Sequence, residues 1–398
     1  MRPRHLVVFF MRGGLDAVLT TAPKSANAVD EHVDIGYSRD ELFSVGNHQF
    51  GPHLRPVERH LSTAAIINGV YAGTLQHAFG AAQLLRMKTR VGFDVPTIGE
   101  VIGHHVRQHP IPAIAFGKVE TTVGIHPAGL LSCTAKGKFL SSGHDLCDDI
   151  VAMTPGELQL AADGLDHLAK GADRAPEVVA SAREIAALMR RLASGIPKPS
   201  TEQWLPETEE ADRNPAFDQP KNGLFQRDCQ RALWALEHEL ATSVIVQPQA
   251  MDWDTHTDNL TGQRQNSTAF FSVFARFLDE LAVRRNAHGT LASQTVVVVA
   301  SEMGRLPRLN DQRGKDHFPE LPVLMWGPRL RVGRSGLVAG AVGRRMESLP
   351  VDLATGLPSA TGAIPTLDDI GASVFAAFGI EARQYGYMGR ALPFLVEV

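Results

Sequence analysis

The run TVVVVASEMGR at residues 295–305 is the most informative stretch of this sequence. Its first six residues are apolar or β-branched and do not alternate with polar residues, which is typical of a strand buried on both faces in a parallel sheet covered by helices. Glu302 follows after one further residue, Ser301, and a carboxylate buried there is unfavourable unless it is paired or ligates a metal. The stretch therefore predicts a central strand with a polar site at its end. Pairing of Glu302 with Arg305 is the structural alternative.

Similar apolar runs recur along the chain, separated by helical patterns. The other expected strands are residues 6–11, 64–69, 112–117, 242–247 and 322–327. The expected helices are residues 74–88, 97–108, 155–170, 176–193, 223–240, 267–286 and 367–379. Because strands alternate with helices, we expect an α/β fold of three layers around a mainly parallel central sheet.

One segment departs from this alternation. Residues 151–222 contain two amphipathic helical patterns and then a polar, proline-containing stretch. We expect a helical insertion and a surface loop there, within a single domain that spans residues 1–398.

Composition excludes several classes of protein. Of the 398 residues, 39 are basic and 43 acidic, so the net charge of −4 argues against a nucleic-acid partner. Three cysteines are too few for a disulfide scaffold. The first apolar run is shorter than the roughly seven to fifteen residues of a signal sequence. No run approaches the roughly 18 apolar residues of a membrane span. We therefore expect a cytoplasmic protein with no membrane partner.

Four polar clusters lie beside expected strands. They are residues 12–16 (RGGLD), 252–256 (DWDTH), 301–305 (SEMGR) and 314–318 (GKDHF). Ligands bind at the carboxyl edge of open α/β sheets, and we expect all four clusters at that edge. Carboxylate oxygens and neutral imidazoles suit zinc, manganese and similar ions. Each cluster has a structural alternative: a helix cap at Asp16, the Glu302–Arg305 pair, and solvated loops for the other two.

Thr74 is a candidate nucleophile. It lies at the expected start of a helix, where backbone N–H groups favour an anion, and a metal that lowers its pKa would let its hydroxyl attack phosphorus or sulfur. The alternative is that Thr74 only caps the helix. His77 follows one turn later and is a candidate for contact with the substrate.

Several motifs together resemble a known family. They are FMRGGLDA (10–17), WDTH (253–256), VVVASEMGRLPRLN (297–310) and GKDHFP (314–319). In order and spacing they are similar to the bacterial "domain of unknown function 1501" family of the alkaline phosphatase-like superfamily, which includes sulfatases and phosphoglycerate mutases. The resemblance runs along nearly the whole chain.

The resemblance implies an alkaline phosphatase-like fold and one or two divalent ions, either zinc, manganese or calcium. The implied ligands are Asp16 and Glu302 for one ion and Asp254, His256 and His317 for the other, with Asp252 or Asp316 as substitutes. The superfamily has Asp-His where this chain has Glu302-Met303, and methionine is a poor ligand for a hard ion, which counts against the second ion.

The leading hypothesis is a metal-dependent hydrolase or transferase that acts on a small anionic phosphate or sulfate ester. The ions would polarise the ester and activate Thr74 or a water molecule. Lys315, Arg12 or Arg305 would neutralise the ester oxygens. The alternative is a non-catalytic family member that binds an anion or a partner protein through the same pocket.

Overall fold

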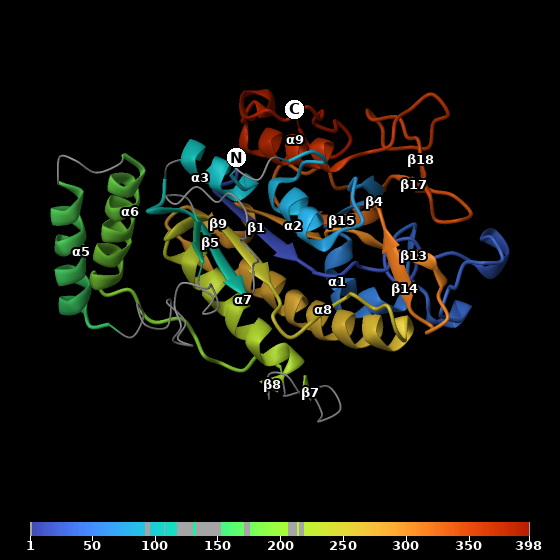
Figure 1. The fold of residues 1–398 in the computed structure, drawn as a ribbon, viewed down its shortest axis with the longest axis horizontal. Coiled ribbons are helices and arrows are strands. Elements are labelled where there is room, and N and C mark those ends of the chain that lie inside the picture. Colours follow the sequence, from blue (N-terminus) through green and yellow to red (C-terminus); the bar gives the residue numbers. More distant parts are fainter. Residues whose placement is uncertain are drawn as a thin grey trace.

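An eight-stranded sheet forms the centre of the computed structural model (Figure 1). The structure describes residues 2–91, 96–106, 108–117, 130–132, 153–170, 176–205, 213–214 and 219–397. In spatial order the strands are β16 (Leu337–Ala339), β4 (Ala65–Tyr71), β15 (Glu320–Trp326), β12 (Thr295–Ala300), β1 (His5–Phe10), β9 (Ala241–Gln247), β5 (Ile111–Gly117) and β6 (Leu130–Ser132). β15 is antiparallel to both neighbours, and the other pairs are parallel.

Helices cover both faces of the sheet, as the sequence predicts. On one face, Val7 and Phe9 of β1 share a core with α7 (Lys221–Glu237) and α8 (Asn259–Val283). On the other face, Leu6, Val8 and Phe10 pack with α2 (His77–Arg86), α3 (Ile98–Val106) and α9 (Leu367–Phe378). Figure 1 shows these three helices on the side of the sheet opposite α7 and α8. Both faces of β1 are therefore buried, which explains its uninterrupted apolar run. The three-layer α/β fold with a mainly parallel sheet is confirmed.

Aromatic rings fill the core beneath β1. The ring of Phe9 meets Phe225, Phe270, Phe274 and Phe277 edge-on, with centroids 5.0–6.0 Å apart. Full burial of one such side chain contributes roughly 2–3 kcal/mol, and edge-on pairs add about 1 kcal/mol. This cluster fixes α7 and α8 against the sheet.

The remaining elements are short or lie outside the sheet. The two-stranded pairs are β2 (Phe43–Val45) with β3 (His48–Phe50), β7 (Arg213–Asn214) with β8 (Gln219–Pro220), β10 (Arg285–Asn286) with β11 (Gly289–Thr290), β13 (Gly304–Leu309) with β14 (Lys315–Phe318), and β17 (Ala341–Val342) with β18 (Ser348–Leu349). The other helices are α1 (Glu58–Leu61), α5 (Pro155–Ala169), α6 (Pro176–Ala193) and the 3₁₀ turns Ala26–Ala28, Arg39–Glu41, Pro52–Val57, Leu291–Ser293 and Ala382–Tyr385.

The segment predicted as a helical insertion contains α5 and α6, which lie side by side beyond the edge of the sheet (Figure 1). A capping box starts α5: the side chain of Thr154 accepts a hydrogen bond from the backbone N–H of Glu157. Among the described residues, no helix combines the length and the apolar character that a membrane crossing requires.

Three sequence predictions need correction. The helix expected from residue 267 begins at Asn259, because its first turns bury polar side chains such as Gln263 instead of apolar ones. The loop expected at residues 314–318 contains the strand β14, whose hydrogen bonds come from β13. The helix expected from residue 74 begins at His77, with Gln76 at its N-cap.

Candidate metal centre

All four polar clusters meet at one edge of the sheet: three follow the carboxyl ends of β1, β9 and β12, and the fourth, on β14, contacts them there. The segment after β1 crosses the segment after β9 so closely that the N–H of Trp253 donates to the carbonyl of Arg12, at 2.9 Å. Gly13 has φ +114°, and a Cβ there would stand 2.1 Å from the backbone nitrogen of Asp254. Only glycine fits this crossing, which places Asp254 at the sheet edge.

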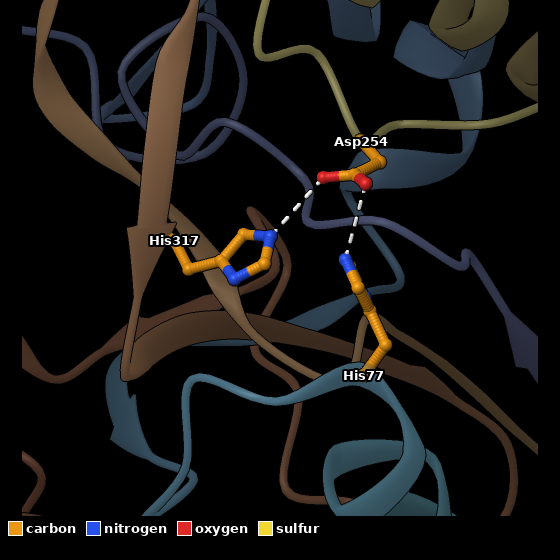
Figure 2. Close-up of side chains that lie close together, drawn as sticks. All are labelled: His77, Asp254 and His317. Atoms are coloured by element: carbon orange, nitrogen blue, oxygen red, sulfur yellow. Dashed lines mark hydrogen bonds and ion pairs between the residues drawn. The ribbon is translucent and has the colours of Figure 1, made fainter.

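Asp254 is the centre of the cluster. Its Oδ2 lies 3.2 Å from Nε2 of His77. Its Oδ1 lies 3.1 Å from Nε2 of His317 and 3.2 Å from Nε2 of His256. Figure 2 shows His77 and His317 pointing at this carboxylate from different elements, α2 and β14. Three imidazoles thus turn the same ring atom towards one aspartate.

The other nitrogen of each imidazole is engaged by a hydrogen-bond acceptor. Nδ1 of His77 lies 2.6 Å from Oε1 of Glu302. Nδ1 of His256 lies 3.0 Å from Oδ1 of Asp316. Nδ1 of His317 lies 2.7 Å from the carbonyl oxygen of Leu75. Carbonyl and carboxylate oxygens only accept hydrogen bonds, so each Nδ1 carries the proton, and the Nε2 of a neutral ring is left with its lone pair.

Two of these lone pairs face one another. Nε2 of His256 and Nε2 of His317 are 3.0 Å apart. In the neutral tautomers that Asp316 and Leu75 select, neither nitrogen has a proton to donate to the other. A metal ion shared by both nitrogens, or a proton on one of them, removes this repulsion.

The donor set fits a divalent transition metal. Ligands about 2.1 Å from a tetrahedral zinc ion are about 3.4 Å from one another, close to the separations of 3.0–3.2 Å between the donor atoms. Among the described residues, His77, Asp254 and His317 form the group whose ligand atoms all lie within 4.8 Å of one another. His256 supplies a further imidazole beside them.

The charges in this cluster are strongly coupled. Hydrogen bonds with Asp254 and Glu302 raise the pKa of His77 to about 9. At neutral pH the metal-free ring is therefore protonated on both nitrogens, and a metal ion would displace the proton on Nε2. Burial alone would raise the pKa of Asp254, but hydrogen bonds from His77 and Arg305 outweigh it and hold that pKa well below its usual range. Asp254 is therefore an anion at any physiological pH, as a metal ligand must be.

Glu302 and Arg305 flank the cluster without exposure to solvent. Arg305 Nη2 lies 2.5 Å from Oδ1 of Asp254, and Nη1 donates to the carbonyl of Lys315 at 2.8 Å. Glu302 accepts the N–H of Gly13 on both oxygens, at 3.0 and 3.1 Å. In the described contacts Glu302 binds Gly13 and His77, whereas Arg305 binds Asp254 and Lys315. These contacts therefore do not support the alternative in which Glu302 pairs with Arg305.

Asp16 and Lys315 form a buried ion pair instead of facing the imidazoles. Nζ of Lys315 lies 2.8 Å from Oδ2 of Asp16, and both side chains are fully buried. Asn259 donates to the same oxygen at 2.9 Å, and the N–H of Val18 donates to Oδ1 at 3.0 Å. These donors occupy both carboxylate oxygens, so the contacts favour a structural role for the pair over metal binding by Asp16 or substrate binding by Lys315.

The other predicted residues lie around the cluster. Thr74 is in the loop before α2, and its hydroxyl oxygen accepts the N–H of Gln76 at 3.1 Å. Asp252 accepts the N–H of Asp254 at 3.0 Å, and Arg12 lies 3.9 Å from its second oxygen. Asp316 holds His256 and is largely exposed. Arg12 keeps a third of its side chain exposed, so its guanidinium can meet a ligand.

Sequence reasoning placed His77 beside the substrate and missed it as a possible metal ligand. It belongs to no recognisable ligand motif, but one signal was present. The buried strand β4 precedes it, and β4 is antiparallel to β15 as β12 is, so β4 and β12 run in the same direction. Their carboxyl ends therefore reach the same edge of the sheet.

One comparison with known proteins identifies a family. The family model described as "Protein of unknown function (DUF1501)" matches residues 3–345. No curated protein matches the sequence.

Solved structures with a similar arrangement of elements come from several bacteria. One is the lipoteichoic acid synthase LtaP from Listeria monocytogenes, 8% identical, with 99% of this chain and 76% of that chain covered and a TM-score of 0.47. Another is the phosphonate monoester hydrolase of Agrobacterium radiobacter, 11% identical, covering 99% and 77%, with a TM-score of 0.45. A third is a sulfatase from Pseudoalteromonas, 9% identical, covering 100% and 72%, with a TM-score of 0.45.

Proposed function

This chain belongs to the DUF1501 family, and we propose that it is a metal-dependent hydrolase or transferase of small phosphate or sulfate esters. The observation that carries the proposal is the pair of imidazole nitrogens of His256 and His317, 3.0 Å apart beside the carboxylate of Asp254. Two imidazole nitrogens this close to each other and to an anionic oxygen form a donor set that suits a shared divalent cation.

We assign His77, Asp254, His256 and His317 as the residues that would hold one divalent ion, with zinc the best match to three nitrogens and one oxygen. When bound, the ion would act as a Lewis acid that polarises an ester oxygen at neutral pH. One ion is favoured over two because Asp16, the ligand expected for a second, is paired with Lys315.

The chain supplies the rest of the site. Arg305 holds Asp254 in place through its 2.5 Å contact, and the partly exposed Arg12 is the candidate cation for a non-bridging oxygen of the ester. Thr74 is the candidate nucleophile, because its loop leads directly to Leu75 and His77. A water molecule is the alternative nucleophile.

Metal content and turnover test the proposal together. We expect purified protein to contain about one equivalent of divalent metal and to hydrolyse an aryl phosphate or an aryl sulfate. Asp254→Asn should lose both properties, and Asp311→Asn, a change in the exposed β13–β14 turn, should lose neither. Bound metal with no turnover of either ester would favour the non-catalytic alternative, in which the pocket only binds an anion or a partner.

The nucleophile is tested by two substitutions at one position. If Thr74 attacks the ester, Thr74→Ala abolishes turnover and leaves the metal bound, while Thr74→Ser keeps activity because the hydroxyl remains. Full activity of Thr74→Ala would assign the attack to water.

A further inference from the structure

We propose that Glu302 is a positioning residue that orients His77 for metal binding and is not itself a metal ligand. The proposal rests on the proposed function in one respect, because it assumes that the cluster around Asp254 binds a metal. It differs from what the sequence predicts, which is that Glu302 coordinates an ion directly.

Protein donors already surround the Glu302 carboxylate. The N–H of Gly13 lies 3.0 Å from Oε1 and 3.1 Å from Oε2, and Nδ1 of His77 lies 2.6 Å from Oε1. The Glu302 side chain is completely buried. A buried carboxylate with these contacts is satisfied without an ion.

The imidazole of His77 stands between Glu302 and Asp254. Its Nδ1 contacts Glu302 at 2.6 Å, and its Nε2 lies 3.2 Å from Oδ2 of Asp254. Since a carboxylate only accepts hydrogen bonds, Glu302 keeps the proton on Nδ1 and leaves Nε2 as the atom that can bind a metal. A carboxylate on the far nitrogen of a ligating histidine fixes the ring and strengthens its binding of the metal.

Helix α2 packs closely against the side chain of Glu302. Gly80 lies one turn after His77, and a Cβ on Gly80 would stand 2.9 Å from Cγ of Glu302 and 3.0 Å from its Cβ. The absence of a side chain at residue 80 therefore lets the first turn of α2, and His77 with it, come within reach of the carboxylate.

Glu302 also contacts the loop after β1, which packs against the loop that carries Asp254. Gly13, which it binds, packs against the backbone of Trp253 and Asp254, and the carbonyl of Gly13 accepts a hydrogen bond from Arg305. The same carboxylate therefore connects His77 to the loop that carries Asp254.

The test compares Glu302→Gln and Glu302→Asp with the wild-type protein, using Co²⁺ as the probe. The amide introduced by Glu302→Gln has the volume of the carboxylate but no charge, so it no longer strengthens Nε2 of His77 as a ligand, and an NH₂ turned to Nδ1 would also favour the tautomer that carries the proton on Nε2. We expect Glu302→Gln to weaken Co²⁺ binding about 10- to 100-fold, and Glu302→Asp to recover part of the affinity. At saturation, the visible absorption of bound Co²⁺ should match that of the wild type, because the ligands are unchanged.

Two further variants keep the test decisive. Gly80→Ala alters no donor atom but pushes α2 away from Glu302, so it should weaken Co²⁺ binding if positioning matters, even if Glu302→Gln fails to fold. Asp369→Asn removes another buried carboxylate, one that caps α9. It should lower stability without changing the affinity for Co²⁺.

The outcomes separate the two proposals. Unchanged affinity in Glu302→Gln, or a changed Co²⁺ absorption band at saturation, overturns the positioning role and leaves the ester chemistry standing. Tight Co²⁺ binding by wild type, weakened in Glu302→Gln, without turnover of either aryl ester supports positioning and overturns the ester chemistry. A wild-type protein that binds no Co²⁺ overturns both.

Discussion

At the scale of single residues, the site depends on the backbone at Gly13 as much as on its charged groups. Asp254 has imidazole partners on both oxygens and a guanidinium partner on Oδ1. All of these contacts require the loop after β1 to cross the loop after β9 at Gly13. The buried guanidinium of Arg305 is stable there because Asp254 and the carbonyl of Lys315 contact it. The ion pairs of this site therefore depend on the backbone conformation at Gly13.

We predict that Gly13→Ala destabilises the protein by about 3 kcal/mol or more. The φ of +114° disfavours alanine, and its Cβ would stand 2.1 Å from the nitrogen of Asp254. Urea unfolding measures the effect. Gly156→Ala is the control, because a Cβ there has no neighbour within 4 Å. Equal stability of the two variants would mean that the crossing is looser than described.

At the scale of elements, α8 shows how a helix can be buried through polar groups. Gln263 in its second turn donates to the carbonyls of Gly14 and Trp253, at 2.9 and 3.1 Å. Asn259 in its first turn binds Asp16. The start of α8 therefore holds the two loops that carry the site, while its later turns pack aromatic side chains into the core.

Helix α9 gives an element-scale prediction. The side chain of Thr366 accepts a hydrogen bond from the N–H of Asp369, and Asp369 binds back to the N–H of Thr366 at 2.9 Å. Thr366→Ala should cost about 1 kcal/mol in the free energy of unfolding. Ser25→Ala, at a 3₁₀ N-cap with no side-chain capping bond, should cost much less. Denaturant titration of both variants checks this, and a similar cost for both would contradict it.

At the scale of the whole molecule, histidines gather at both edges of the sheet. The carboxyl edge holds the candidate metal centre. At the amino edge, His5 and His109 lie with ring centroids 4.7 Å apart. Burial and the neighbouring imidazole lower the pKa of His5 to about 3, and burial lowers the pKa of His109 to about 4. Both rings are therefore neutral at neutral pH.

The buried pair His5 and His109 predicts that the folded protein loses stability in acid. As the pH falls below about 6.5, the unfolded chain takes up a proton on His5 while the folded chain does not, so the free energy of unfolding decreases. At pH 4.5 the loss from His5 is about 2 to 3 kcal/mol, two pH units at 1.36 kcal/mol each. His5→Gln should reduce the loss of stability between pH 7 and 4.5, measured by urea unfolding. His32→Gln, at a largely exposed ring, should not.

Metal removal gives the second prediction for the whole molecule. An ion that binds only the folded chain, at about 1,000 times its Kd, stabilises it by about 4 kcal/mol. At about 2.1 cal/mol/K per residue, this corresponds to about 5 °C in Tm for a chain of this length. A chelator should lower Tm by that amount in wild type and not in Asp254→Asn. An identical wild-type melting curve with excess chelator would argue against the metal centre.

The sequence by itself determined the layers and the edge at which chemistry is placed. Runs such as TVVVVA cannot be solvated on either face, so they had to become central strands between helices. Parallel strands end at a common edge of the sheet, so segments far apart in the chain meet there. His77 contacts both Asp254 and Glu302, and His256 contacts Asp254.

Only the tertiary structure decided which partner each polar group takes. Asp16 pairs with Lys315 and not with the imidazoles, His77 lies beside Asp254, and residues 315–318 form a strand against β13. The start of α8 escaped prediction because its buried face is polar. The physical reason is common to all four: hydrogen bonds and ion pairs are short-ranged and directional, so they depend on distances that the order of residues does not contain.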